Sequence, residues 1–435
     1  MPANATPAVQ DLSQTTDRDA AAARYSEVRR LSQELAEPLA PEDQVVQSMP
    51  DVSPTKWHLA HTAWFFETFL LEPFAEGYEV FHPGYGYLFN SYYEAVGPRH
   101  PRPERGLVTR PTTGEVRAYR DHVDEHMLRL IEKADPALWF RIASLIELGL
   151  NHEQQHQELI LTDIKHVFSR NPLRPAYSPG RPFEPKAAPP LEWFDYEGGV
   201  IEIGHDGPGF AFDNEGPRHE VVLRPFRLSS RLVTNGEFLD FIEDGGYENP
   251  EHWLFDGWAM VQQRGWRAPL YWEKVDGEWR IMTLAGVYPL ERGVPVCHAS
   301  YFEAAAYAAW AGKRLPTEAD WEVAARGLED AGPGAGNFLD SGRLHPVPAR
   351  ETGTGPAQMF GDAWEWTQSA YGPYPGYRPA AGAVGEYNGK FMCNQLVLRG
   401  GSCATPPGHL RATYRNFFPP DARWQFSGFR LAEDA

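Results

Sequence analysis

The sequence predicts a protein of two domains, a helical domain followed by an irregular α+β domain. Helical periodicity recurs in segments between residues 19 and 169 and then stops. From Pro172 to Pro190 seven prolines fall in nineteen residues, a composition that excludes a helix or a central strand. Beyond this break short strand-like runs alternate with glycine turns. A chain of 435 residues is also too long for one ordinary core.

Four segments with helical periodicity define the first domain, at residues 19–37, 54–72, 115–134 and 136–169. Ser53 and Pro54 are expected to open the second segment as N-cap and first-turn residue. Asn171-Pro172 ends the fourth segment. Four such helices form a bundle, whose core is a usual place for metal ligands. The long connection at 73–114 should carry function or cover a site.

Helices in the second domain are indicated by their first residues. Thr234, Ser300 and Thr317 each stand three residues before an acidic residue, which is the spacing of a capping box. We therefore divide the chain into a mobile N-terminal tail, a helical domain, a proline-rich linker and an α+β domain. Their predicted ranges are 1–18, 19–171, 172–192 and 193–435.

The composition excludes several functions. The chain carries 59 acidic and 40 basic side chains, a net charge of −19, which argues against nucleic acid and anionic membranes as partners. No segment approaches the roughly 20 apolar residues of a membrane span. Three cysteines are too few for a disulfide framework, and the N-terminus shows no signal-peptide pattern. We expect a cytoplasmic protein.

Two histidines in Asn151-His-Glu-Gln-Gln-His156 indicate a metal site. Histidines four apart on a helix point the same way, and apolar residues flank this pair on both sides, so that it should be buried. A second helix offers a third ligand, either His61 or its neighbour His58. Three neutral imidazoles leave coordination positions open, as a catalytic metal requires.

Other histidines and other functions compete with this interpretation. The pair His122 and His126 stands among acidic residues and is typical of a solvated helix face. The segment from His152 to His156 also matches the zinc-peptidase pattern, in which Glu153 would be the general base. A metal-dependent thiol transferase would use the same three histidines without redox chemistry. A binding module without catalysis is the remaining alternative.

Several phrases of the second half resemble formylglycine-generating enzymes, whose fold is a variant of the C-type-lectin fold. They are Gly198–Gly204, Val233–Phe238, Arg314–Arg326, Gly361–Trp366, Leu398–Ser402 and Gly428–Arg430. Most of these residues are expected to be scaffold rather than chemistry. Formylglycine generation needs a cysteine pair after the Arg-Gly-Gly-Ser phrase, and here Cys403 stands alone. We therefore do not expect that activity.

The histidines of the first half resemble those of DinB-like bundle enzymes. Joined in this order, a DinB-like four-helix bundle and a C-type-lectin-like domain resemble the iron-dependent sulfoxide synthases of ergothioneine biosynthesis, over about residues 20–431. The resemblance implies a site between the two domains, with Fe(II) on His61, His152 and His156. It implies that dioxygen is used to join a thiol to the imidazole of hercynine as a sulfoxide.

The resemblance also implies how substrates are held. Gln155 and Asn416 would hydrogen-bond the substrate imidazole, and Phe417 would pack against its trimethylammonium group, a sound pairing of a cation with a ring face. Family members that use γ-glutamylcysteine carry an aspartate where this chain has Phe418. We therefore expect L-cysteine as the thiol, although simple thiol dioxygenation remains an alternative reaction.

The long connection supplies the remaining candidates. Arg99 and Arg102 are candidates for the thiol substrate's carboxylate, with solvated loop arginines as the competing interpretation. Tyr92 and Tyr93 are candidate proton donors, because a phenol is protonated at neutral pH. In other family members that tyrosine comes from the second domain, where the alternatives are Tyr374, Tyr377 and Tyr387.

Overall fold

The computed structural model describes residues 17–180, 186–328, 336–351, 353, 355–380 and 382–435. These residues form two compact units, and each is described by itself. The first contains the described residues up to Tyr177 with Gly207–Phe210 and Pro379–Tyr387, and the second contains Ser178–Asp206, Ala211–Arg378 and Asn388–Ala435. Most of the predicted tail and residues 181–185 of the predicted linker lie outside the described residues. No described helix is both long and apolar enough to cross a membrane.

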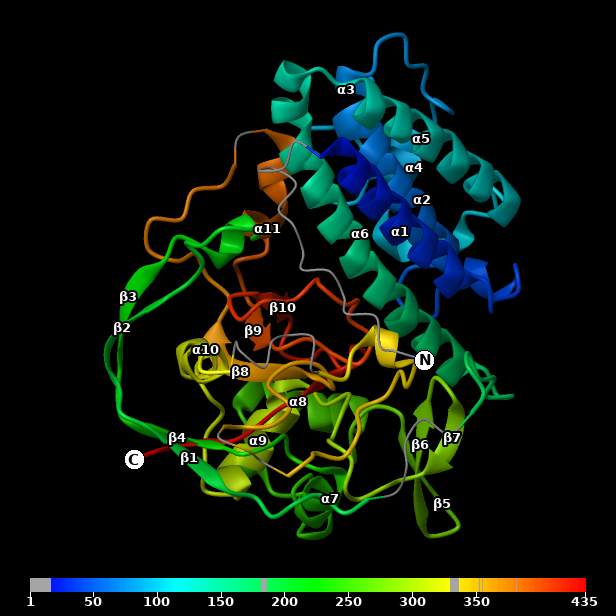
Figure 1. The fold of residues 1–435 in the computed structure, drawn as a ribbon. Helices are drawn as coiled ribbons and strands as arrows, with labels where there is room; N and C mark the ends of the chain where they lie inside the picture. Colours follow the sequence, from blue (N-terminus) through cyan, green and yellow to red (C-terminus); the bar gives the residue numbers. More distant parts are fainter. Residues whose placement is uncertain (1–16, 181–185, 329–335, 352, 354, 381) are drawn as a thin grey trace, which may run out of the picture. The chain divides into compact units, whose positions relative to one another are not determined.

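Four long helices dominate the first unit (Figure 1): α1 (Arg18–Ala36), α2 (Thr55–Phe66), α5 (Thr113–Lys133) and α6 (Pro136–Arg170). Both α1 and α2 pack against α5 and α6. The bounds of α1, α5 and α6 fall within two residues of the predicted ranges. Thr112 begins α5 with a capping box, and Asp135 caps α6, which has proline at its first position.

The second helix departs from its prediction at both ends. It begins at Thr55 with Pro54 as N-cap, and the Ser53 hydroxyl accepts a hydrogen bond from Arg105 instead of capping the helix. At Glu67 the helix widens into a π-helical turn, η2 (Glu67–Leu71), before α3 (Glu72–Phe74). The Glu67 carboxylate accepts hydrogen bonds from Tyr78 and Tyr119. A buried polar anchor of this kind is invisible to hydrophobic periodicity.

Short elements fill the connections of the first unit. They are η1 (Asp43–Val45), α4 (Tyr85–Phe89), η3 (Arg102–Leu107), η9 (Ala383–Gly385) and the start of α11 (Glu386–Lys390). The predicted connection at 73–114 is thus ordered by α4 and η3. Lys56 holds it to α2 by donating to the carbonyls of Val108 and Pro111.

A buried ionic network joins the four long helices. Glu153 of α6 is fully buried and accepts from Arg29 of α1 at 2.8 Å, from Arg120 of α5 at 2.8 Å and from Ser32 at 2.6 Å. Arg120 also donates to the carbonyl of Leu59 in α2 at 2.9 Å. Burial alone would raise the pKa of Glu153, but the two guanidinium groups outweigh it and hold the pKa at about 2.

The second unit is built from short strands and helices. Its strands are β1 (Trp193–Tyr196), β2 (Gly199–Ile203), β3 (His219–Leu223), β4 (Phe226–Ser229), β5 (Trp272–Val275), β6 (Glu278–Thr283), β7 (Gly286–Pro289), β8 (Trp364–Ala370), β9 (Leu396–Arg399), β10 (Asn416–Phe418), β11 (Ser427–Gly428) and β12 (Ala432–Asp434). Its helices are η4 (Asp213–Glu215), α7 (Asn235–Glu243), η5 (Pro250–His252), α8 (Phe255–Arg264), α9 (Tyr301–Trp310), α10 (Glu318–Arg326), η8 (Leu339–Ser341) and the rest of α11. The three predicted capping boxes are present at α7, α9 and α10.

The strands form four small sheets, with the orders β1-β4-β12, β10-β9-β8-β11, β2-β3 and β5-β6-β7. All pairs are antiparallel except β11 with β8.

Arg399 of β9 is fully buried and pairs with Glu318 and Glu322 of α10. Arg430 pairs with Glu365 of β8 in the same manner. The motif arginines of this unit therefore hold the scaffold together, as expected from the sequence.

We predict that Glu153→Gln destabilises the first unit by about 3–5 kcal/mol at pH 7, because it leaves buried guanidinium charge without its partner. The folded-state pKa of Glu153 lies below its unfolded value, so this stabilisation is present above about pH 4.3 and is lost as the pH falls toward 2. Urea unfolding at pH 7 and pH 3 measures both effects. Glu125, which forms an exposed ion pair with Arg129, provides the control. Glu125→Gln should lower the free energy of unfolding by less than about 0.5 kcal/mol.

Candidate metal centre

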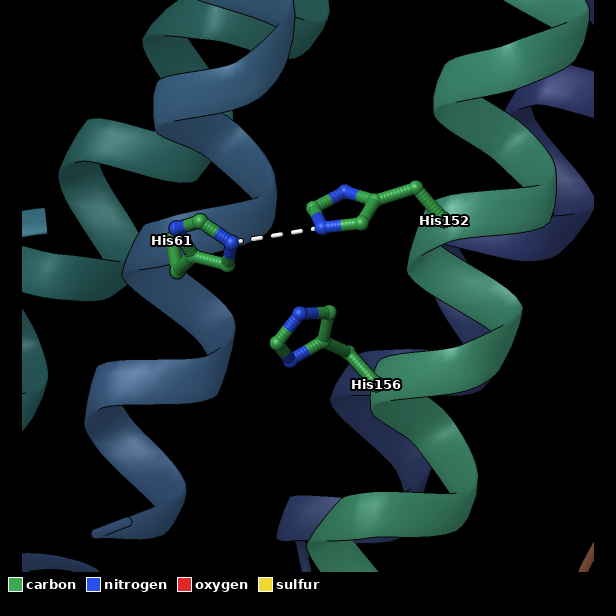
Figure 2. A group of neighbouring side chains, drawn as sticks. All are labelled: His61, His152 and His156. Carbon is green, nitrogen blue, oxygen red and sulfur yellow. Dashed lines mark hydrogen bonds between the residues drawn. The ribbon is translucent and has the colours of Figure 1, made fainter. Parts of the chain in front are cut away.

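Three histidines from α2 and α6 converge at one point inside the first unit (Figure 2). Their candidate ligand nitrogens all lie within 4.8 Å of one another. The Nε2 atoms of His61 and His152 are 3.2 Å apart, and the ring of His156 lies 4.7 Å from both of the other rings. Among the described residues this is the group of histidine, cysteine and acidic side chains that could hold a metal ion.

The ring of His61 is fixed from three directions. Its Nδ1 lies 2.6 Å from the carbonyl oxygen of Phe89, so Nδ1 carries the proton and Nε2 presents a lone pair. Trp57 stacks on the imidazole at 4.6 Å with an interplanar angle of 12°, and Trp64 does so at 5.4 Å and 15°. These contacts aim Nε2 of His61 toward the two histidines of α6.

The two histidines of α6 are held differently. His156 Nδ1 lies 2.8 Å from Nδ1 of His58, one turn before His61 on α2. His152 packs its ring at 4.8 Å from Phe65, and its buried Nδ1 has no hydrogen-bond partner. All three candidate ligands can therefore direct Nε2 toward a common point.

Burial sets the charge of the three rings. It lowers the pKa of His152 to about 4. Burial, reinforced by the neighbouring histidines, lowers the pKa values of His61 and His156 well below the ordinary value. The imidazoles are neutral at pH 7, and a neutral imidazole is the form that binds a metal.

The donor set fits a transition metal with open coordination positions. Three neutral imidazole nitrogens without a carboxylate or thiolate suit iron, zinc, copper or nickel. A structural zinc site would be closed by a fourth protein ligand, and no such ligand joins this group among the described residues.

Of the two candidate proton donors, Tyr93 is separated from this group by one aromatic ring. Tyr93 is buried, with its ring 5.6 Å from Trp64, the residue that stacks on His61. Burial raises the pKa of Tyr93 above its ordinary value, so the phenol stays protonated. Tyr92 accepts a hydrogen bond from Arg102. Phe89 belongs to the same stretch of chain and binds His61, which places this stretch beside the metal group.

The segment Pro379–Tyr387 belongs to the same unit and contacts this stretch. The Glu386 carboxylate accepts from the backbone N–H groups of Glu94 at 2.8 Å and of Ala95 at 3.2 Å. The ring of Tyr387, one of the alternative tyrosines, lies 6.1 Å from that of Tyr92. Burial raises the pKa of Tyr387 as well. Three tyrosines thus lie in the unit that contains the histidines.

The other alternative tyrosines lie in the second unit. Tyr374 is buried and donates to Glu318, while Tyr377 donates to Asp213 at 3.0 Å.

The two candidate arginines have different hydrogen-bond partners. Arg99 is partly exposed and paired with Glu94, whereas Arg102 donates to Tyr92 and to the carbonyl of Asp51.

The predicted substrate residues are divided between the units. Gln155 is partly buried on α6, next to His156. Asn416, Phe417 and Phe418 form β10 in the second unit. The Phe417 ring stacks on Tyr371 at 4.0 Å and lies 5.7 Å from Phe391, while Phe418 meets Trp424 edge to face at 5.8 Å. Within the second unit these residues therefore form one aromatic strand.

Sequence reasoning missed Asp163, which is the partner of His58. Asp163 accepts from Nε2 of His58 at 3.0 Å and from the backbone N–H of Ser53 at 2.8 Å. Its spacing of seven residues from His156 places both on one face of α6, which is a signal that the sequence did contain. Arg105 was also missed: its guanidinium lies 3.4 Å above the ring of Trp57.

The peptidase interpretation does not fit the structure. A zinc-peptidase glutamate must reach a metal-bound water as general base. Here the two carboxylate oxygens of Glu153 are bound by Arg29, Arg120 and Ser32, and its low pKa makes it a poor base. Glu153 is a structural residue of the helical unit. The rings of His122 and His126 lie 4.3 Å apart with an interplanar angle of 41°, and both residues are partly buried and do not belong to the metal group.

Comparison with known proteins defines the class of this protein. Residues 24–160 match the DinB superfamily, and residues 194–435 match the Sulfatase-modifying factor enzyme 1-like domain. The class is therefore one in which a DinB helical region with three convergent histidines precedes a sulfatase-modifying-factor domain. The formylglycine-generating enzyme of Bos taurus, 30% identical over 62% of this chain and 80% of its own length, is similar to the second part.

Relatives that cover both parts identify the family. Hercynine oxygenase of Mycolicibacterium smegmatis is 34% identical over 89% of this chain and 92% of its own length. Hercynine oxygenase of Mycobacterium tuberculosis is 34% identical over 88% and 92%. The chain belongs to the hercynine oxygenase family. This membership confirms the resemblance seen in the sequence and the predicted enzyme class, an oxygen-dependent oxidoreductase.

Solved structures match less well. PvdO from Pseudomonas aeruginosa aligns with a TM-score of 0.38 and 20% identity, over 56% of this chain and 94% of its own. Such a score does not by itself define a fold.

We predict that His61→Ala, His152→Ala and His156→Ala each weaken metal binding by more than about 100-fold, beyond the 10–100-fold typical of outer-shell residues. His126→Ala, on the partly exposed histidine pair of α5, should bind metal normally. Titration of metal-free protein with Fe(II) or Co(II) against a competing chelator measures the affinity. Unchanged affinity in any of the three variants would remove that histidine from the ligand set.

Proposed function

We propose that this protein is a mononuclear non-haem Fe(II) enzyme that joins the sulfur of L-cysteine to the imidazole carbon of hercynine. The product is hercynylcysteine sulfoxide, and the reaction balances with dioxygen: one oxygen atom enters the sulfoxide and the other leaves as water, with the hydrogens of the C–H and S–H bonds. The observation that carries the proposal is the group of three neutral, convergent imidazoles in a member of the hercynine oxygenase family.

Bound at the three histidines, Fe(II) would supply the redox chemistry that activates dioxygen. The chain's own residues would hold the ion and orient the substrates. His61 is clamped between two tryptophans, so its lone pair needs no reorganisation when the ion binds. Trp57 and Trp64 pack on His61 and Phe65 packs on His152, and this aromatic lining would limit water near the reacting groups and strengthen polar contacts there.

Hercynine would be held through its imidazole and its ammonium. Gln155 and Asn416 each carry an amide that can both donate to and accept from the imidazole nitrogens. The Phe417 ring, stacked on Tyr371, offers an electron-rich face for a trimethylammonium group. These assignments come from the family resemblance, and the position of Gln155 beside His156 on α6 supports the first of them.

Cysteine would be held by its carboxylate. The site would offer no partner for the γ-glutamyl amine of a longer thiol donor. Arg102 and Arg99 are the proposed carboxylate partners, and Arg102 would exchange its contact with the Asp51 carbonyl for the substrate. Phe418 packs on Trp424 and has no charge to hold the amine of a γ-glutamyl group. This supports cysteine over γ-glutamylcysteine.

Tyr92 and Tyr93 are the proposed proton donors. Tyr93 is kept protonated by burial, and the guanidinium of Arg102 donates to the hydroxyl of Tyr92 and so orients it. Delivering a proton to the reduced oxygen would direct the reaction to the sulfoxide rather than to thiol dioxygenation. We further propose that the helical unit is a DinB-type four-helix bundle and the second unit a C-type-lectin-like domain.

We predict oxygen uptake when Fe(II)-loaded, anaerobically purified protein receives hercynine and cysteine, with one labelled oxygen in the sulfoxide when heavy-isotope dioxygen is used. A parallel sample with γ-glutamylcysteine should react at least about tenfold more slowly, and Phe418→Asp should reduce that difference. Oxygen uptake and product mass are the measurements. No uptake with either thiol would contradict the proposal and favour a thiol transferase, whereas cysteine sulfinate without hercynine incorporation would identify a thiol dioxygenase.

We predict that Tyr92→Phe or Tyr93→Phe lowers sulfoxide formation by about 100-fold, the smaller end of general-acid effects, and increases cysteine sulfinate. Tyr87→Phe, in the same connection but 44% exposed, is the matched control. The product ratio, measured by mass under one oxygen concentration, separates the two outcomes. If neither variant changes this ratio, the donor must be another group, and Tyr387→Phe would be tested next.

A further inference from the structure

A chain of hydrogen bonds leads from a buried carboxylate to one of the candidate metal ligands. Asp163 of α6 accepts from Nε2 of His58 at 3.0 Å, and Nδ1 of His58 lies 2.8 Å from Nδ1 of His156. Asp163 is 4% exposed and His58 is 2% exposed. Neither residue belongs to the group of side chains that could hold a metal ion, which is His61, His152 and His156.

The direction of the hydrogen bonds follows from the carboxylate. An ionised carboxylate only accepts, so Nε2 of His58 must carry a proton. When Nε2 holds the one proton of the His58 ring, its Nδ1 has a lone pair and accepts from Nδ1–H of His156. His156 with its proton on Nδ1 has its lone pair on Nε2. The carboxylate of Asp163 thus determines which nitrogen of a residue two hydrogen bonds away is free.

We infer that Asp163 and His58 are positioning residues that select Nε2 of His156 as its metal-binding nitrogen. The inference rests on His156 being a metal ligand, as the proposed function holds. Metal-bound histidines commonly donate their second N–H to a carboxylate or carbonyl, which fixes the tautomer and raises the basicity of the ligand. Here the carboxylate acts through an intervening histidine.

The three candidate ligands differ in how they are oriented. His61 is oriented by a backbone carbonyl of Phe89, and the buried Nδ1 of His152 has no hydrogen-bond partner. Among the hydrogen bonds that the described residues make, His156 is the candidate ligand whose Nδ1 contacts a side chain that leads to a carboxylate. The tautomer of His156 can therefore be changed by substituting residues that are not themselves candidate ligands.

The surroundings of Asp163 show that this carboxylate is retained at a cost. Its Oδ2 accepts both the His58 hydrogen bond and the backbone N–H of Ser53, while its buried Oδ1 has no partner. A buried carboxylate oxygen without a partner is destabilising. The nearby Arg105 donates to the Ser53 hydroxyl and supplies compensating positive charge. An asparagine at 163 could hold the Ser53 N–H equally well, so the backbone contact alone does not explain an acid.

The tautomer can be measured directly in metal-free protein at neutral pH. Proteins with ¹⁵N-labelled histidine report, through ring nitrogen shifts and couplings, whether a neutral imidazole carries its proton on Nδ1 or Nε2. His156 should be in the Nδ1–H form in the native chain. Asp163→Ala and His58→Leu should move it to the Nε2–H form or to a mixture. A native His156 in the Nε2–H form would overturn the inference.

A conservative variant separates orientation from packing. His58→Asn can place an amide oxygen where Nδ1 was and accept from His156, so it should restore the Nδ1–H form that His58→Leu loses. The control is Glu147→Ala, which removes a buried carboxylate of α6 that pairs with Arg24 and Asn151. It should lower stability without changing the His156 tautomer. A tautomer change of equal size in this control would show a merely structural effect and overturn the inference.

Metal affinity provides the second measurement. Asp163→Ala and His58→Leu should weaken Co(II) binding by about 10- to 100-fold and alter its visible absorption, while His58→Asn and Glu147→Ala stay near the native affinity. Affinity unchanged in both of the first two variants would overturn the inference. Neither measurement requires turnover. A failure of the proposed reaction would leave the tautomer and affinity results intact, so the two failures are distinguishable.

Discussion

The helical unit depends on the enclosure of one carboxylate, that of Glu153, by the guanidinium groups of Arg29 and Arg120. The residues come from α6, α1 and α5, and Arg120 extends the network to a carbonyl of α2. A buried charge tolerates little displacement, because losing one partner leaves the other uncompensated. The network therefore fixes the rotation of α6 about its axis. With 3.6 residues per turn, that rotation also decides where His152 and His156 point.

Burial has the opposite effect on charge in the metal group, where the side chains are neutral rather than ionised. His61 and His152 are also buried and His156 is partly buried, but no carboxylate touches the rings of His61 and His152 among the contacts that the structure describes, and removal from water keeps these rings neutral. One helix thus carries a permanently ionised residue beside two uncharged ligands. The His-Glu-x-x-His motif shared with zinc peptidases has a different role here, since the glutamate is a structural residue in the core of the unit and not a catalytic base.

Much of the fold was predictable because it depends on local signals. Helical periodicity and caps located α1, α5 and α6, and the capping boxes located α7, α9 and α10. The start of α2 was wrong in detail, because Ser53 binds Arg105 from a distant part of the chain. The π-helical turn that follows α2 and the hydrogen bonds of Glu67 were not predicted, for the same reason. Hydrogen bonds between residues far apart in sequence leave no periodic trace.

The sequence by itself determined the helix faces that carry His152 and His156, the acidic composition, and the motifs that identify the hercynine oxygenase family. These features depend on residue type and on spacing within one element. The residues alone left His61 and His58 both open, and the family resemblance favoured His61. Only the tertiary structure shows that His58 contacts His156, that Glu153 is a structural ion, and that Asp163 faces His58. Each of these depends on how one helix is turned against another, which buried charge and packing determine and no single segment encodes.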